Sequence, residues 1–188
     1  MRVVAGTQKG RRLKTPQTLH LRPTSARVRE ALFSILSDRV KGTQWLDLYA
    51  GTGAIGIEAL SRGAEHVVFI EPNPSSIRIL RENIGRCSYT QSSTVINCEA
   101  REFLRPAGAS ESPTLFDIVF ADPPYHETDL EHLLSTLSGS SQVSSQGLII
   151  LEHFSKTLLP ERIGNLHRSR QSRYGDTTLT FFSFAQGH

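Results

Sequence analysis

The chain has 188 residues, 38% of them hydrophobic, and a net charge of +3, which suits one globular domain with at most a small appendage. It has neither an apolar signal-peptide segment nor an apolar run that could span a membrane, so we expect a soluble cytoplasmic protein without membrane partners. Its two cysteines, Cys87 and Cys98, have neither disulfide-framework nor metal-ligand spacing, so we expect a reducing compartment and no metal.

The N-terminal end is strongly basic. Its first 41 residues contain ten lysines and arginines against two acidic residues, Glu30 and Asp38. Such asymmetry favours a nucleic-acid-binding end whose binding weakens with salt, and a solvated basic face is the alternative. The pattern of residues 2–13 predicts a short β-hairpin, and a helix should follow from a cap at Thr24 or Ser25 to about residue 40. We therefore predict residues 1–41 as a nucleic-acid-facing appendage to a domain formed by residues 42–188.

From Trp45 onward, apolar strands alternate with amphipathic helices. The expected strands are 45–49, 66–70, 94–97, 116–121 and 147–152, and the expected helices are 54–62, 74–86, 129–137 and 157–163. Two final strands, 166–173 and 177–184, are joined by Gly175-Asp176, which is a hairpin signal. The order predicts an α/β fold with a doubly wound, mostly parallel sheet that ends in an antiparallel hairpin.

A glycine loop follows the first expected strand. In Gly51-Thr52-Gly53-Ala54-Ile55-Gly56 the glycines let the backbone approach a ligand, at the sheet edge where such folds bind nucleotides. Glu71 ends the second strand, where a carboxylate can accept both ribose hydroxyls or instead cap the next helix. Asp47 can contact a ligand amino group through water, or it can hold the loop by bonding to its amides.

The tetrapeptide Asp122-Pro123-Pro124-Tyr125 follows the fourth expected strand. An amine on a nucleobase is a weak nucleophile, because its lone pair is delocalised into the ring. The Asp122 carboxylate and the Pro123 carbonyl can each accept one N–H and aim that lone pair, the prolines stiffen the loop, and Tyr125 offers a face on which a base can stack. An ordinary strand-ending turn is the alternative.

Two other classes of function remain to be weighed. The spacing Gly51-x-Gly53-x-x-Gly56 with a later acid also fits NAD binding, but an oxidoreductase would lack a proton-transfer pair and leave the Asp122 loop without a role. A non-catalytic RNA-binding module would explain the basic end but neither loop.

The motifs resemble those of a known family. The segment from Leu46 to Ala64 resembles motif I of class I S-adenosylmethionine-dependent methyltransferases, and residues 122–125 resemble their amino-methylating motif IV. Residues 2–6, 10–13 and 21–33 closely resemble the RsmD family, bacterial 16S rRNA guanine-N2 methyltransferases, and residues 173–180 are similar to that family's last hairpin. The resemblance spans nearly the whole chain.

The resemblance implies a seven-stranded sheet, S-adenosylmethionine as methyl donor, and a guanine of 16S rRNA as target, within the small ribosomal subunit or its assembly intermediate. We expect a monomer. The implied cofactor-binding residues are Asp47, Tyr49, Ala50, Gly51, Thr52, Gly53, Gly56, Glu71, Pro72, Asn73, Glu99, Ala100 and Asp122. The implied catalytic residues are Asp122, Pro123, Pro124 and Tyr125, and the expected RNA contacts are Arg11, Arg12, Arg22, Thr24, Arg27, Arg29 and Tyr125.

The identity of the base is not fixed by the chemistry of this site. The same tetrapeptide occurs in enzymes that methylate adenine N6 or cytosine N4 in DNA, and related loops act on a glutamine amide. The prediction that the target is an rRNA guanine therefore rests on the family resemblance, and a DNA amino-methyltransferase remains the alternative.

Overall fold

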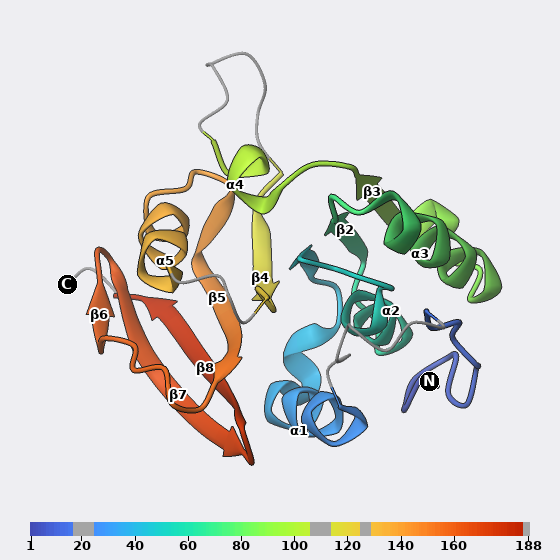
Figure 1. Ribbon diagram of the computed structural model, residues 1–188, viewed down its shortest axis with the longest axis horizontal. Coiled ribbons are helices and arrows are strands. Elements are labelled where there is room, and N and C mark those ends of the chain that lie inside the picture. Colours follow the sequence, from blue (N-terminus) through green and yellow to red (C-terminus); the bar gives the residue numbers. More distant parts are fainter. Residues whose placement is uncertain (17–24, 106–113, 125–128, 186–188) are drawn as a thin grey trace.

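The computed structural model describes residues 1–16, 25–105, 114–124 and 129–185, and these form one sheet with helices on both faces (Figure 1). The strand order is β3-β2-β1-β4-β5-β8-β7-β6. The strands are β1 (Gln44–Leu48), β2 (His66–Ile70), β3 (Ser93–Ile96), β4 (Phe116–Ala121), β5 (Val143–Phe154), β6 (Arg162–Ile163), β7 (Leu166–Tyr174) and β8 (Thr177–Phe184). β1 to β5 run parallel, and β8, β7 and β6 add antiparallel pairs, which confirms the predicted architecture.

The helices cover the sheet in two layers, each with its own hydrophobic core. They are α1 (Ala26–Leu36), α2 (Ala54–Ser61), α3 (Pro74–Arg86), α4 (Ala100–Phe103) and α5 (Leu130–Ser138). One core joins α1, α2 and α3 to residues such as Trp45 and Phe120, and the other joins α4 and α5 to residues such as Leu48 and Ala121. No helix among the described residues is both long and apolar enough to cross a membrane.

Some elements differ from the sequence-based expectation. Within the described ranges the sheet has eight strands rather than seven, because the two-residue β6 pairs with β7. The helix expected at 157–163 is absent: after a turn at 155–156 the segment is irregular through Pro160 and ends in β6. α1 ends at Leu36, where Ser37 has a φ of 47°, and a 3₁₀ turn continues to Val40.

The N-terminal arm, which we define as residues 1–16, folds back on itself as predicted, with the N–H of Val3 bonded to the carbonyl of Arg11, and it packs on the main domain. Its strands are reduced to a single bridge between Arg2 and Arg12. Val3 and Leu13 are buried in the same core as α1 and α2. The boundary at residue 41 stays a prediction, but the two sides of that boundary share one core.

Candidate active site

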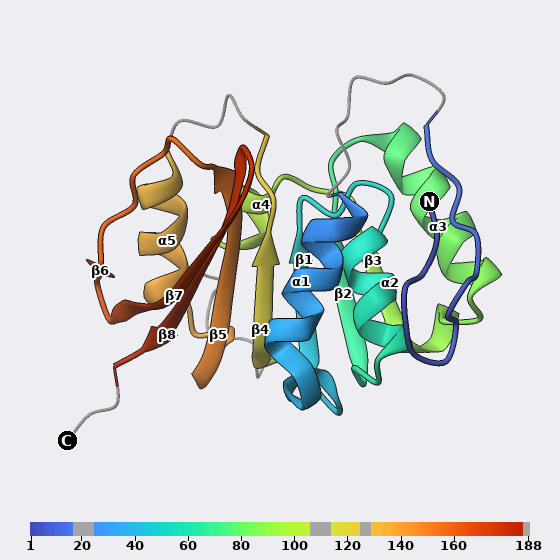
Figure 2. The ribbon, with the colours of Figure 1, turned by 90° about the horizontal axis from the view of Figure 1, so that it is seen from below.

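The three signals found in the sequence meet at the carboxyl edge of three neighbouring strands. β1 lies between β2 and β4, and Leu48 is in register with both Ile70 and Ala121. The glycine loop, Glu71 and Asp122 follow these three strands directly, so they share one edge, which Figure 2 shows at the upper ends of the strands. A parallel sheet of this kind binds ligands at that edge.

The glycine loop is a tight turn that leads into α2. Gly53 donates its N–H to the carbonyl of Ala50 at 2.8 Å and precedes the first residue of the helix. Tyr49, Gly51 and Gly53 all have positive φ, of 61°, 55° and 82°. A Cβ on Gly53 would lie 2.3 Å from Leu80 Cδ1, whereas a Cβ on Gly51 would meet no atom within 4 Å. Gly53 is therefore favoured by its positive φ and by its close packing against Leu80 of α3, and Gly51 presents its backbone to open space.

Glu71 holds this loop in place. One carboxylate oxygen accepts the N–H of Gly51 and the other accepts the N–H of Asn73, each at 2.8 Å. Glu71 is 7% exposed. The cap of α3 is Asn73, whose side chain accepts from Ser75 and Ser76, so Glu71 does not itself cap the helix. A contact from Glu71 to a ribose stays a prediction.

Asp47 is a buried acid beneath the loop. Its carboxylate accepts the N–H of Gly56 at 3.0 Å, as expected for a loop-holding carboxylate. Burial raises the pKa of Asp47 to about 8; the N–H of Gly56 lowers it, and the charges of Asp122 and Glu71 add to the rise. Asp47 is therefore largely protonated at neutral pH. The strand register brings the three acids to the same edge of the sheet.

The Asp122 loop begins immediately after β4. Asp122 is half-buried, Pro123 is buried and Pro124 is exposed, while Tyr125 lies outside the described residues. At the far side of the same edge, Glu99 is exposed immediately before α4, and Ala100, the first residue of that helix, is buried. The structure thus brings the described members of the predicted cofactor and catalytic sets to one edge.

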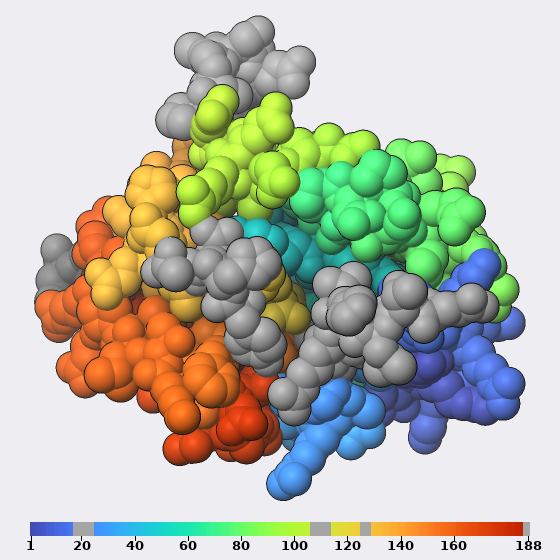
Figure 3. Space-filling view, viewed as in Figure 1, coloured from blue at the N-terminus to red at the C-terminus, as the bar shows by residue number. Residues whose placement is uncertain are grey.

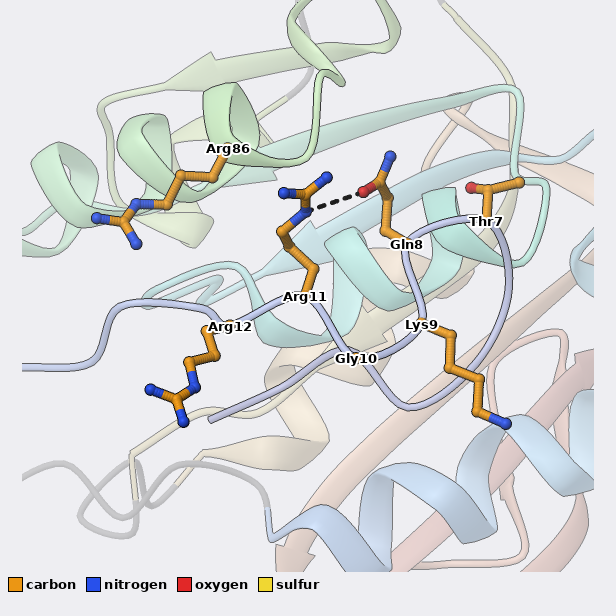
Figure 4. A pocket seen from close by; sticks show the side chains of 7 residues that line it. All are labelled: Thr7, Gln8, Lys9, Gly10, Arg11, Arg12 and Arg86. Carbon is orange, nitrogen blue, oxygen red and sulfur yellow. Dashed lines mark hydrogen bonds between the residues drawn. The ribbon is translucent and has the colours of Figure 1, made fainter.

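The N-terminal arm forms a basic cavity of about 730 Å³ with the end of α3. Its lining residues are Thr7, Gln8, Lys9, Gly10, Arg11, Arg12 and Arg86. In Figure 4, Arg11 extends toward α3 and donates to the Gln8 side chain at 3.2 Å, whereas Lys9 and Arg12 point away from α3. The sequence analysis did not predict Arg86 as part of this basic surface, because Arg86 ends α3 and lies outside the basic segment 1–41.

The residues expected to contact RNA differ in their exposure to solvent. Arg11, Arg12 and Arg27 are exposed, and Arg22 and Thr24 lie outside the described residues. Arg29 is 1% exposed, donates to the carbonyl of Arg2 at 2.7 Å, and lies 3.7 Å from the Glu58 carboxylate. The prediction for Arg29 is wrong, because its guanidinium is inside the protein and holds the arm.

Two buried residues attach the arm to the helices of the site. Glu58 of α2, 1% exposed, accepts the N–H groups of Val4 and Ala5 at 2.8 and 3.0 Å. Asn83 of α3, 0% exposed, accepts the N–H of Lys14 and donates to the carbonyls of Lys14 and Thr52. The sequence analysis missed both residues, although a single carboxylate within the apolar segment 54–61 is a recognisable signal.

Comparisons with known proteins agree with this geometry. A family model described as "Conserved hypothetical protein 95" matches residues 1–183. The chain is 36% identical to the putative rRNA methyltransferase YlbH of Bacillus subtilis, covering 97% of this chain and 98% of the relative. It is 35% identical to the ribosomal RNA small subunit methyltransferase D of Escherichia coli, covering 90% and 84%.

Solved structures show the same fold. The putative methyltransferase yhhF from Escherichia coli matches with a TM-score of 0.86 at 31% identity, over 100% of this chain and 99% of that one. An RNA methyltransferase from Salinibacter ruber, solved with S-adenosyl-L-homocysteine, matches with a TM-score of 0.65 at 17% identity, over 88% and 95%, a likeness that concerns the fold alone. The family match over nearly the whole chain and the two relatives above 30% identity establish that the chain belongs to the RsmD family.

Proposed function

We propose that this protein is an S-adenosylmethionine-dependent methyltransferase that methylates the exocyclic N2 amine of a guanine in small-subunit rRNA. The observation that carries the proposal is the position of Asp122-Pro123-Pro124 at the end of β4, one strand away from the glycine loop. The family relatives named as rRNA methyltransferases support the reaction and its substrate class.

The described residues fit the cofactor. Gly51 offers backbone to open space beside the Glu71 carboxylate, which suits a ligand with a polar chain and a ribose. Glu71 would accept the ribose hydroxyls, and Glu99 and Ala100 would border the adenine. Pro72 and Asn73 would line the ribose side of the site. When bound, S-adenosylmethionine supplies an electrophilic methyl group on a positively charged sulfur.

Asp122 and Pro123 would orient the target amine. Each can accept one N–H of the amine, which aims the lone pair and offsets the positive charge that develops as the nitrogen becomes tetrahedral. Tyr125 would stack on the base, a contact worth about 1–3 kcal/mol. A base within a duplex cannot bring its amine into such a site, so the guanine would have to be extruded or unpaired.

The N-terminal arm would hold the RNA at some distance from the transfer site. The arm lies beside α3 on the molecular surface (Figure 3). Its Thr7 N–H bonds to the carbonyl of Ser61, which is the last residue of α2, while the glycine loop adjoins the first. Eight helical residues span about 12 Å. Arg11, Arg12 and Arg86 are therefore suited to phosphates flanking the target, and Arg27, exposed on the first turn of α1, is a further candidate contact.

Two measurements test the proposal. Calorimetry should show binding of S-adenosylhomocysteine and no binding of NAD; tight NAD binding without a response to S-adenosylhomocysteine would refute it. Labelled S-adenosylmethionine should then methylate small ribosomal subunits or free 16S rRNA from a strain that lacks this protein, and nucleoside analysis should identify N2-methylguanosine. We expect the enzyme to act as a monomer on the subunit or its assembly intermediate. Methylation of DNA instead of rRNA would refute the proposed substrate.

A further inference from the structure

A row of acidic residues crosses the sheet at its carboxyl edge, and Glu152 is the member to which the proposed function assigns no role. Glu71 follows β2, Asp47 lies in β1, Asp122 follows β4, and Glu152 lies in β5, the next strand along. Leu151 is in register with Ala121, so Glu152 stands at the level of Asp122. Neighbouring strands are about 4.8 Å apart, so the two backbones are close.

Glu152 also shares a face with the other acids. Ile150 lies in the core beneath α1, α2 and α3, and Leu151 lies in the opposite core. Because side chains alternate along a strand, Glu152 faces the same side as Ile150. Phe120 lies in that core too, and the same alternation directs Asp122 to this face. Glu152 is 6% exposed.

The order of the row places Glu152 on the substrate side. Glu71 and Asp47 hold the glycine loop, so the cofactor belongs over β2 and β1. Asp122 is next and would receive the amine. The ring that carries the amine must then extend away from the cofactor, toward β5, where Glu152 lies. Glu152 is paired to Leu179 of β8, so its position is fixed by the sheet and not by a loop.

We infer that Glu152 determines the base by accepting the N1–H of the target guanine. This inference rests on the proposed function. Guanine carries two adjacent donors, N1–H and the N2 amine, which suit two neighbouring carboxylates. Adenine N1 and cytosine N3 instead present a lone pair beside their amines, and a buried carboxylate would repel that lone pair. Glu152 is thus a specificity-determining residue: it distinguishes guanine from adenine and cytosine, which the Asp122 loop alone does not do.

The test compares two target bases that differ at N1, and it compares wild-type protein with variants at Glu152. Small ribosomal subunits are assembled on 16S rRNA whose target nucleotide, mapped from the wild-type product, is either guanosine or 2-aminopurine riboside. The analogue keeps the 2-amine but has a lone pair at N1. We expect wild-type kcat/KM for guanine to exceed that for 2-aminopurine by at least about 100-fold, since sites built to bond a substrate N–H reject analogues that lack it.

Glu152→Gln should reduce this preference to about 10-fold or less, because an amide can accept from guanine N1–H or donate to the analogue's N1. Glu152→Asp, which keeps the charge, should retain the preference at a lower rate. Glu71→Gln is the matched control: the same substitution in the same row should weaken S-adenosylhomocysteine binding and leave the base preference unchanged.

The outcomes separate this inference from the proposed function. If Glu152→Gln slows both bases equally and keeps the wild-type preference, Glu152 has only a structural role and the inference is overturned. A wild-type product methylated on adenine or cytosine would overturn the inference and leave a methyltransferase standing. Absence of S-adenosylhomocysteine binding and of any methylated nucleoside would refute the proposed function, and the inference with it.

Discussion

Asp122 is the residue on which the proposed chemistry depends most directly. Its carboxylate would act when the amine becomes tetrahedral and positive, and interactions made only in the transition state lower kcat when they are removed. Asp122→Ala should reduce single-turnover methyl transfer about 100- to 1,000-fold, with S-adenosylhomocysteine affinity largely kept. Asp122→Asn should be milder, because an amide oxygen still accepts a hydrogen bond.

Asp117 provides a control on the same strand. It is exposed at the start of β4, where it accepts the N–H of Gln44 at 2.8 Å, far from the carboxyl edge. Asp117→Ala should leave the transfer rate near the wild-type value. Wild-type turnover in Asp122→Ala would rule out the role given to this carboxylate.

Asp47 makes stability depend on pH. Its pKa is about 8 in the folded protein against 3.8 for an unperturbed aspartate, so between these pH values the folded state holds a proton that the unfolded state has lost. The free energy of unfolding then falls as pH rises, by at most about 1.4 kcal/mol per pH unit from this group. The stabilisation is complete below pH 3.8 and is lost by about pH 8.

Asp47→Asn should remove this pH dependence and keep an oxygen that can accept the Gly56 N–H. In urea unfolding, the stability of the variant relative to wild type should therefore rise from pH 4 to pH 8 and level off above pH 8. A relative stability that stays constant over this range would mean that Asp47 is ionised in the folded protein.

The charge pattern of the sequence found the basic end but not the environment of each residue in it. Arg11 and Arg29 are both arginines of the basic end. Arg11 lines a cavity, whereas Arg29 is buried beside Glu58. Burial depends on contacts between segments about 30 residues apart, which local spacing does not encode. The sequence did predict that Asp122 and the glycine loop belong to the site, because each forms part of a motif of adjacent residues.

At the scale of elements, Asn83 joins the arm to the cofactor loop. It bonds the backbone of Lys14 at 2.7 and 3.1 Å and the carbonyl of Thr52 at 3.0 Å. Asn83→Ala leaves these groups without that partner, at a cost of about 1–3 kcal/mol for each group that stays buried. We expect a lower melting temperature and weaker S-adenosylhomocysteine binding, measured by calorimetry.

Asn165→Ala is a suitable comparison, because Asn165 is exposed beside β7 at the other end of the sheet. Its effect on stability should stay within about 0.5 kcal/mol. If Asn83→Ala binds S-adenosylhomocysteine like the wild type, the contact with Thr52 does not support the loop.

Elements with a continuous apolar run were predicted well, whereas short or polar ones were not. β2 and β4 match their expected bounds, because buried parallel strands consist of such runs. The segment 157–163 was wrongly predicted as a helix, since its helix-compatible composition does not reveal that Pro160 and the pairing of β6 with β7 determine its course. α4, four residues long, is too short to show a periodic pattern.

At the scale of the whole molecule, the N-terminal arm and α3 present a basic surface away from the transfer site. Arg11 and Arg12 come from the arm and Arg86 from α3. If these residues hold rRNA phosphates, each lost contact should reduce the slope of log affinity against log salt by about 0.7 to 0.9. Arg11→Ala/Arg12→Ala should therefore weaken RNA binding and flatten its salt dependence by somewhat under two units, with S-adenosylhomocysteine affinity unchanged.

Arg39→Ala/Arg162→Ala removes two exposed positive charges elsewhere, after α1 and in β6, and so controls for net charge alone. Binding of 16S rRNA is titrated at four salt concentrations for wild type and both double variants, and S-adenosylhomocysteine binding is measured in parallel. The control should keep the wild-type slope, because long-range attraction without bound phosphates releases no condensed counterions. An unchanged slope in Arg11→Ala/Arg12→Ala, together with lost S-adenosylhomocysteine binding, would mean that the arm supports the pocket and not the RNA.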